Sequence, residues 1–89
     1  MQRRSYRVHG RVQGVGFRYT AAQLANRHRL TGSVQNLPDG TVALVVQGEP
    51  EALAAFLTEL SECFEGYISR WDETTMPVEP DELGFQIVR

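Results

Sequence analysis

The chain of 89 residues contains no lysine and only one cysteine, Cys63. A single cysteine excludes an intramolecular disulfide and a cysteine-rich metal site. No apolar run approaches the roughly 20 residues that a membrane-spanning helix requires. The N-terminal segment is basic but lacks the apolar core of a secretory signal, so a cytoplasmic location is the default expectation. Cys63 lies beside Phe64 near the end of an apolar helical pattern, and it is expected to fill the core.

Acidic residues are absent from the first 38 positions, which contain seven arginines and carry a charge of +7. Residues 39–89 contain the other two arginines and all eleven acidic residues, a charge of −9. This distribution places positive potential around the N-terminal half, where it would attract an anionic ligand. Alternatively, each arginine except Arg18 pairs with an acid of the other half in the folded chain. Both interpretations remain open at this point.

Two glycines and an arginine stand out in residues 10–18, Gly-Arg-Val-Gln-Gly-Val-Gly-Phe-Arg, between a strand pattern and a helix pattern. Gly14 and Gly16 can adopt positive φ without steric cost, which lets successive backbone N–H groups form a concave anion site. The following helix adds its free first-turn N–H groups, and Arg18 adds a planar fork for phosphate oxygens. The loop therefore predicts phosphate binding by Gln13, Gly14, Val15, Gly16, Phe17 and Arg18. A plain turn is the alternative, and the Gly-Lys-Ser/Thr ending of a nucleotide-triphosphate loop is missing.

Hydrophobic periodicity predicts a single domain, residues 1–89, in which strands and helices alternate. Strands are expected over 5–12, 33–37, 41–47 and 67–75, with a last strand around Phe85 and Ile87. One helix is expected to start at Phe17 and to be capped by Gly32, and a second to follow Pro50. This β-α-β-β-α-β order with a terminal strand is typical of a ferredoxin-like α+β sandwich. We expect an antiparallel sheet of four to five strands with both helices on one face.

Asn36 stands at the end of a predicted strand, immediately before the Pro-Asp-Gly turn. From its position alone, it would be a turn residue whose side chain binds its own backbone. The alternative is that its amide holds a water, because an amide accepts from one hydrogen and donates to a nearby oxygen. His9 and His28 have no carboxylate or cysteine at metal-ligand spacing, so both are interpreted as surface or boundary residues.

Two separate segments resemble the acylphosphatase family: residues 10–18 resemble its phosphate loop, and residues 32–42 resemble its second motif. Ser33 and Ala43 depart from the pattern, where the family often has a large aromatic and an acid. The resemblance implies hydrolysis of acyl phosphates to carboxylate and inorganic phosphate, with Arg18 and the N–H groups of 14–18 holding the phosphate and Asn36 positioning the water. It implies no metal, cofactor or covalent intermediate.

The resemblance also implies a small, stand-alone enzyme that acts on a small-molecule acyl phosphate, with inorganic phosphate or sulfate as a competing anion. Nothing in the sequence demands more than a monomer, and a monomer is expected. Neither a nucleic-acid partner nor a membrane is expected. Two alternatives remain. A ferredoxin-like sheet with a basic half is typical of RNA- or anion-binding modules, although the paired aromatics that stack bases are missing. The chain could also serve as a domain of a carbamoyl-transfer enzyme, which its own Met1 disfavours.

Overall fold

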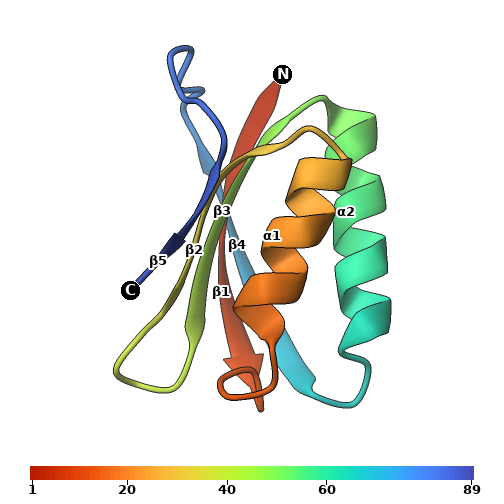
Figure 1. The fold of residues 1–89 in the computed structure, drawn as a ribbon, viewed down its shortest axis with the longest axis vertical. Helices are drawn as coiled ribbons and strands as arrows, with labels where there is room; N and C mark the ends of the chain where they lie inside the picture. Colours follow the sequence, from red (N-terminus) through yellow and green to blue (C-terminus); the bar gives the residue numbers. More distant parts are fainter.

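The computed structural model describes all 89 residues and contains five strands and two helices (Figure 1). Their order is β1 (Gln2–Gly10), α1 (Phe17–Arg27), β2 (Thr31–Asn36), β3 (Val42–Gly48), α2 (Pro50–Cys63), β4 (Ile68–Met76) and β5 (Phe85–Val88). This order is the one that the sequence predicts, and the boundaries differ by a few residues. No helix is long and apolar enough to cross a membrane.

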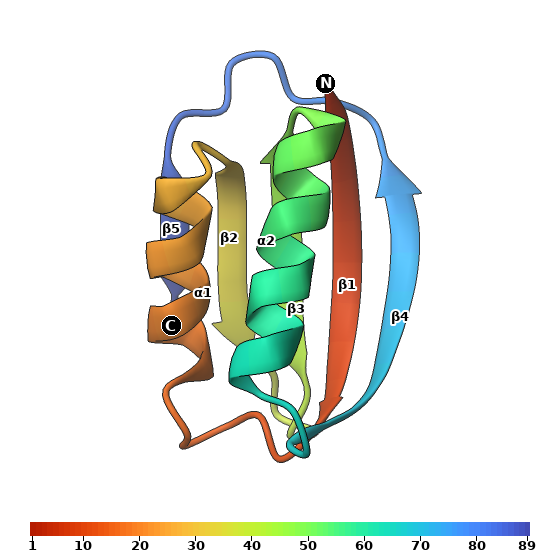
Figure 2. The same ribbon diagram turned by 90° about the vertical axis from the view of Figure 1, so that its right-hand side faces the viewer.

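The strands form one sheet in the order β4-β1-β3-β2-β5, and both helices cover the same face (Figure 2). β1 pairs antiparallel with β3 and β4, and β2 pairs antiparallel with β3. The ferredoxin-like α+β prediction is therefore confirmed. β5 pairs parallel to β2, so the sheet is mixed at this edge rather than antiparallel throughout. The parallel pairing arises because residues 77–84 carry the chain from one edge of the sheet across to the other.

The predicted apolar faces meet in one core of 16 buried residues between the sheet and the helices. Along β3 the side chains of Val42, Leu44 and Val46 alternate with more exposed ones, and all three are fully buried. α1 and α2 contribute the predicted helical stripes, and their buried members are Phe17, Ala21, Leu24, Ala25, Leu53, Phe56 and Leu60. Apolar residues that recur with a period of 2 in the strands and 3.6 in the helices therefore pack into one layer.

Two local predictions are wrong. Gly32 does not cap α1: the helix ends at Arg27, and Arg29 is the residue with a left-handed φ of 58°. Gly32 lies in β2, where a Cβ would stand 1.9 Å from the carbonyl oxygen of Val45, so close strand pairing explains this glycine. Cys63 does not fill the core either, because the last turn of α2 leaves it exposed.

The end of β2 and the start of α1 lie on the same side of the sheet. Gly32 and Val34 are buried beneath the helices, and alternation along β2 places Asn36 on that same face. α1 packs over β2 and β5 and begins at the level of the hairpin between β2 and β3 (Figure 2). The fold therefore brings Asn36 next to Phe17 and Arg18.

Candidate active site

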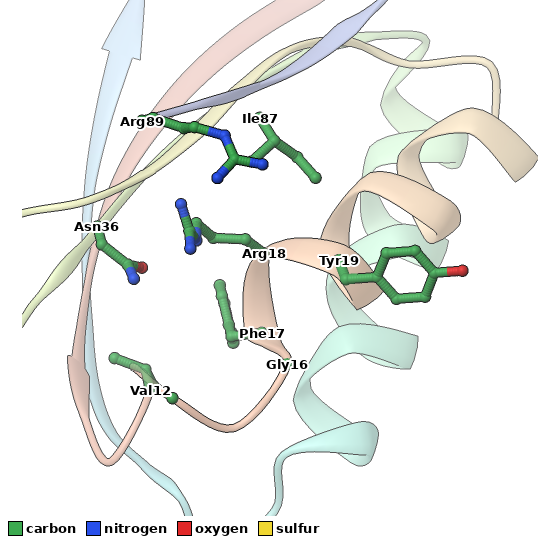
Figure 3. Close-up of a pocket in the computed structure, with 9 residues that line it drawn as sticks. Val12, Gly16, Phe17, Arg18, Tyr19, Asn36, Ile87 and Arg89 are labelled. Carbon is green, nitrogen blue, oxygen red and sulfur yellow. The ribbon is translucent and has the colours of Figure 1, made fainter.

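A pocket of about 300 Å³ opens between the glycine loop, the end of β2 and the end of β5 (Figure 3). Nine residues line it: Val12, Gly14, Gly16, Phe17, Arg18, Tyr19, Asn36, Ile87 and Arg89. The structure thus brings together Gly14, Gly16, Phe17, Arg18 and Asn36 from the predicted site. The guanidinium groups of Arg18 and Arg89 and the carboxamide of Asn36 face the same space in Figure 3.

The glycine loop has the backbone conformation that an anion site requires. Gly14 and Gly16 adopt φ of 76° and 82°, and Gly16 is the N-cap of α1. None of the backbone N–H groups from Gly14 to Tyr19 donates a hydrogen bond to another backbone group. Amides left free at a helix N-terminus, together with the positive end of the helix dipole, favour an anion. This loop is therefore a cradle of free donors rather than a plain turn.

Most arginines outside the pocket are paired with acidic side chains. Four arginines of the first 38 residues form ion pairs with acids of the second half: Arg3–Glu82, Arg4–Glu73, Arg7–Asp39 and Arg27–Glu59. Arg11 lies over the ring of Tyr67, 4.9 Å from its centroid. Arg18, Arg29 and Arg89 form no ion pair with an acidic side chain, and of these three Arg18 and Arg89 line the pocket. Ion pairing thus applies to four arginines of the first half, while two guanidinium groups without an acidic side-chain partner face the pocket.

Asn36 lines this pocket and has an unused hydrogen-bond acceptor. Its Oδ1 is buried and has no hydrogen-bond partner within the protein. Buried polar atoms without a partner are rare in folded proteins, and they are costly. The turn interpretation of Asn36 requires a bond to its own backbone, and no such bond exists. Asp39 forms this local bond instead, since its Oδ1 accepts from the N–H and the hydroxyl of Thr41.

Gln13 and Val15 belong to the predicted loop but do not line the pocket. Val15 packs against the core and so anchors the loop. The side chain of Gln13 is directed toward the β2–β3 hairpin, where its Nε2 donates to the carbonyl oxygens of Leu37 and Thr41 at 2.8 and 2.9 Å.

Ile87, Tyr19 and Arg89 line the pocket but were missed at the level of sequence. Alternation of Phe85, Ile87 and Arg89 could have indicated a shared face of the last strand. The strand's partner could not have been inferred in that way. Parallel pairing of Val34 with Ile87 and of Gln35 with Val88 is what carries Arg89 to the level of Asn36.

No aspartate, glutamate or histidine lines the pocket. His9 and His28 are boundary residues, as predicted, and each binds a carboxylate away from this site: His9 contacts Asp72 at 2.9 Å and His28 contacts Glu59 at 2.6 Å. No group of three or more His, Cys, Asp or Glu side chains is arranged to hold a metal ion. The guanidinium groups and the carboxamide that do line the pocket can bind an anion and orient a neutral molecule.

Comparison with known proteins assigns the chain to a family. Residues 4–87 match the family model described as acylphosphatase. The chain belongs to the acylphosphatase family. A protein from Geobacillus thermodenitrificans named acylphosphatase is 42% identical over 82 residues, which cover 91% of this chain and 87% of that protein. With such relatives, the chain is an enzyme of the hydrolase class.

Solved structures agree with the family. The crystal structure of acylphosphatase from Bacillus subtilis superposes with a TM-score of 0.91 at 32% identity and covers all of both chains. The crystal structure of HypF from T. kodakarensis superposes with a TM-score of 0.86 at 31% identity over the whole of this chain, but over only 12% of that longer protein. The same fold therefore occurs both alone and as part of a larger chain.

Proposed function

We propose that this protein hydrolyses the carboxyl–phosphate bond of acyl phosphates by the following route. The observation that carries the proposal is the coincidence, in one pocket, of free backbone donors, two unpaired guanidinium groups and an orphaned amide oxygen. A tetrahedral dianion would accept hydrogen bonds from the backbone donors and the guanidinium groups, and a water molecule would donate one to the amide oxygen of Asn36. Family membership points to the same reaction.

Arg18 and the N–H groups of residues 14–18 bind the phosphoryl group of the substrate. A guanidinium donates two parallel hydrogen bonds to phosphate oxygens, and its charge persists at every physiological pH. Charge on the equatorial oxygens rises in the transition state, where donors that are already in place stabilise it most. Arg89 adds a second positive charge at the rim of the pocket.

Asn36 orients the attacking water, whose hydrogen it accepts at Oδ1. The water oxygen attacks phosphorus as the bond between phosphorus and the acyl oxygen breaks, and the carboxylate leaves with the electron pair. A carboxylate is a good leaving group, so little acid assistance is needed. Because no carboxylate or imidazole lines the pocket, the proton of the water passes to a phosphate oxygen of the substrate.

The acyl group extends toward the rim, where the apolar side chain of Ile87 lines the pocket and is 40% exposed. The ring of Tyr19 is directed away from this space (Figure 3). Burial of apolar surface against Ile87 favours an aromatic or aliphatic acyl group over a small polar one. Benzoyl phosphate is accordingly a suitable probe.

The decisive experiment is incubation of the pure protein with benzoyl phosphate and EDTA, while the loss of ultraviolet absorbance is followed. We expect hydrolysis that persists with EDTA and is inhibited competitively by inorganic phosphate. Absence of hydrolysis, or loss of activity on chelation, would contradict the proposed route. We further propose a cytoplasmic, monomeric enzyme, which fractionation and light scattering would test.

An RNA-binding function has less support. The aromatic residues of β1 and β4, Tyr6 and Trp71, contact each other edge-to-face with ring centroids 5.7 Å apart. Tyr6 is buried, and Trp71 packs against the core on the helix-covered side of the sheet. They are not on the open face, where stacking on bases would require them. A salt-dependent shift of an RNA fragment without hydrolysis of benzoyl phosphate would favour this alternative.

A further inference from the structure

The side chain of Gln13 forms the only hydrogen bonds between the glycine loop and the β2–β3 hairpin. Its Nε2 donates one hydrogen to the carbonyl oxygen of Leu37 and the other to that of Thr41, at 2.8 and 2.9 Å. Gln13 directly precedes Gly14, the first glycine of the loop, and Leu37 directly follows Asn36. One carboxamide therefore connects the segment that carries Arg18 to the segment that carries Asn36.

The hairpin is closed by its own hydrogen bonds and does not need Gln13 to form. The N–H of Leu37 donates to the carbonyl of Thr41 at 2.9 Å, and the N–H of Gly40 donates to that of Leu37 at 3.1 Å. Asp39 adds bonds to the backbone N–H and the hydroxyl of Thr41. Gln13 instead fixes the position of the closed hairpin relative to the glycine loop.

Both acceptors are carbonyl oxygens, so the bond pattern requires two donors on one atom. A primary amide provides them without charge, whereas a carboxylate provides none and is repelled. Asn36 also lacks any side-chain hydrogen bond within the protein that would hold it against the loop. The alignment of its amide with Arg18 therefore depends on how the hairpin is held.

We propose that Gln13 is a positioning residue, which acts through Asn36 by locking the hairpin to the phosphate loop. This inference rests on the function proposed above. It differs from direct phosphate binding by the Gln13 side chain, because both of its N–H groups are already used. Loss of the lock misaligns the attacking water and leaves the phosphate cradle intact, so it lowers kcat more than it weakens phosphate binding.

The test compares Gln13→Met with a matched control, Gln47→Met. Gln47 is the other glutamine whose side chain holds a loop: its Nε2 donates to the carbonyl of Glu79 at 2.9 Å, and its Oε1 accepts from the N–H of that residue at 2.7 Å. It lies at the opposite end of β3. We expect Gln13→Met to lower kcat for benzoyl phosphate by about 10- to 100-fold while the inhibition constant of phosphate changes by less than about threefold. Gln47→Met should lower the melting temperature and keep the wild-type kcat.

A second variant, Gln13→Glu, provides a pH profile that a merely structural role would not produce. At neutral pH the introduced carboxylate faces two carbonyl oxygens and donates nothing. Protonation at lower pH restores one donor, so the ratio of variant to wild-type kcat should rise between pH 7 and pH 5. The charged groups at the hairpin are Asp39 and Arg7, whose Nη1 lies 3.5 Å from Oδ2 of Asp39. The Thr41 hydroxyl and N–H hold the pKa of Asp39 below its usual value, so Asp39 remains charged in this range.

Hydrogen exchange tests the contact between Gln13 and the hairpin without an activity assay. Loss of the lock should accelerate exchange of the Leu37 and Gly40 amides in Gln13→Met but not in Gln47→Met. Unchanged kcat in both Gln13 variants, or an equal loss of kcat and phosphate affinity, would overturn the inference. If the wild-type protein does not hydrolyse benzoyl phosphate while the hairpin amides still respond, the lock stands and the proposed function fails.

Discussion

The two ends of the sheet differ in how completely their polar groups are satisfied. At the end with the glycine loop, six consecutive N–H groups, two guanidinium groups and the Oδ1 of Asn36 have no partner among the hydrogen bonds and ion pairs of the protein. At the opposite end, Arg3 binds Glu82 at 2.7 Å, and Gln47 binds the backbone of Glu79 through both of its amide atoms. Unsatisfied groups are costly, and natural proteins retain them chiefly at functional sites. The comparison supports the proposal that the end with the glycine loop is the one that binds the substrate.

The largest effect is expected from removal of the central cation. Arg18→Ala should lower kcat/KM by roughly 10²-fold or more and abolish measurable inhibition by phosphate, because it removes a charge-assisted pair of donors. Arg18→Lys should restore little, since a point charge does not reproduce the planar fork. Steady-state kinetics with benzoyl phosphate measure both effects. Arg27→Ala is the control: it removes the same charge from the other end of α1, and wild-type kinetics are expected.

Asn36→Ala should lower kcat by about 10²-fold and leave the inhibition constant of phosphate nearly unchanged. Stability should not fall, because the deleted Oδ1 is a buried acceptor without a partner. Gln35→Ala is the matched control, since Gln35 is adjacent on β2 but faces the opposite side of the sheet. A parallel loss of phosphate affinity in Asn36→Ala would contradict the assignment to water.

A smaller effect is expected from the second cation of the pocket. Arg89→Gln should raise KM about three- to tenfold with little change in kcat, because Arg89 is exposed and adds attraction at the rim. KM of the variant should also depend less on ionic strength than KM of the wild type. Arg70→Gln is the control, because Arg70 is the other arginine of the second half and binds Asp72 on β4. Identical salt dependence in Arg89→Gln and wild type would show that Arg89 does not act on the substrate.

The smallest effect is expected at the opposite end of the sheet, where the polar groups are paired, and it changes stability but not activity. The hydrogen bond from Arg3 holds the pKa of Glu82 below its usual value, so the folded state binds this proton less readily than the unfolded state. The pair therefore stabilises the fold above the unfolded pKa of about 4.3, and this contribution is lost as pH falls through the folded pKa. Arg3→Gln should lower the free energy of unfolding by about 1 kcal/mol or less at pH 7, with a smaller difference near pH 3. Denaturant titrations at the two pH values measure it, and kcat should not change.

Most of the fold could be predicted from the sequence, because its signals are local. The turn Leu37-Pro38-Asp39-Gly40 indicated a hairpin, and the apolar stripe of α2 indicated a buried helix face. Gly32 misled the prediction because a glycine past a helix resembles a cap. Its actual constraint is the approach of Val45 on the neighbouring strand, which no local pattern reveals.

The candidate site could be predicted in part. Gly14, Gly16 and Arg18 are adjacent in sequence, so their joint chemistry was apparent, and the structure confirms the positive φ of both glycines. Arg89 could not be found in this way, because nothing in the chain indicates that its strand pairs parallel to β2. Cys63 was misplaced for a related reason: periodicity locates a helix face only within about a residue at the frayed last turn.

By itself the sequence determined the order of the elements, the glycine loop and the excess of arginine in the first half, since each depends on neighbours along the chain. Only the tertiary structure decided which arginines are paired with acids and which remain free, because their partners lie on other strands. The tertiary structure also brings the start of α1, the end of β2 and the end of β5 together at one pocket. Strand register and the crossing of residues 77–84 control that meeting, and both are long-range properties of the fold.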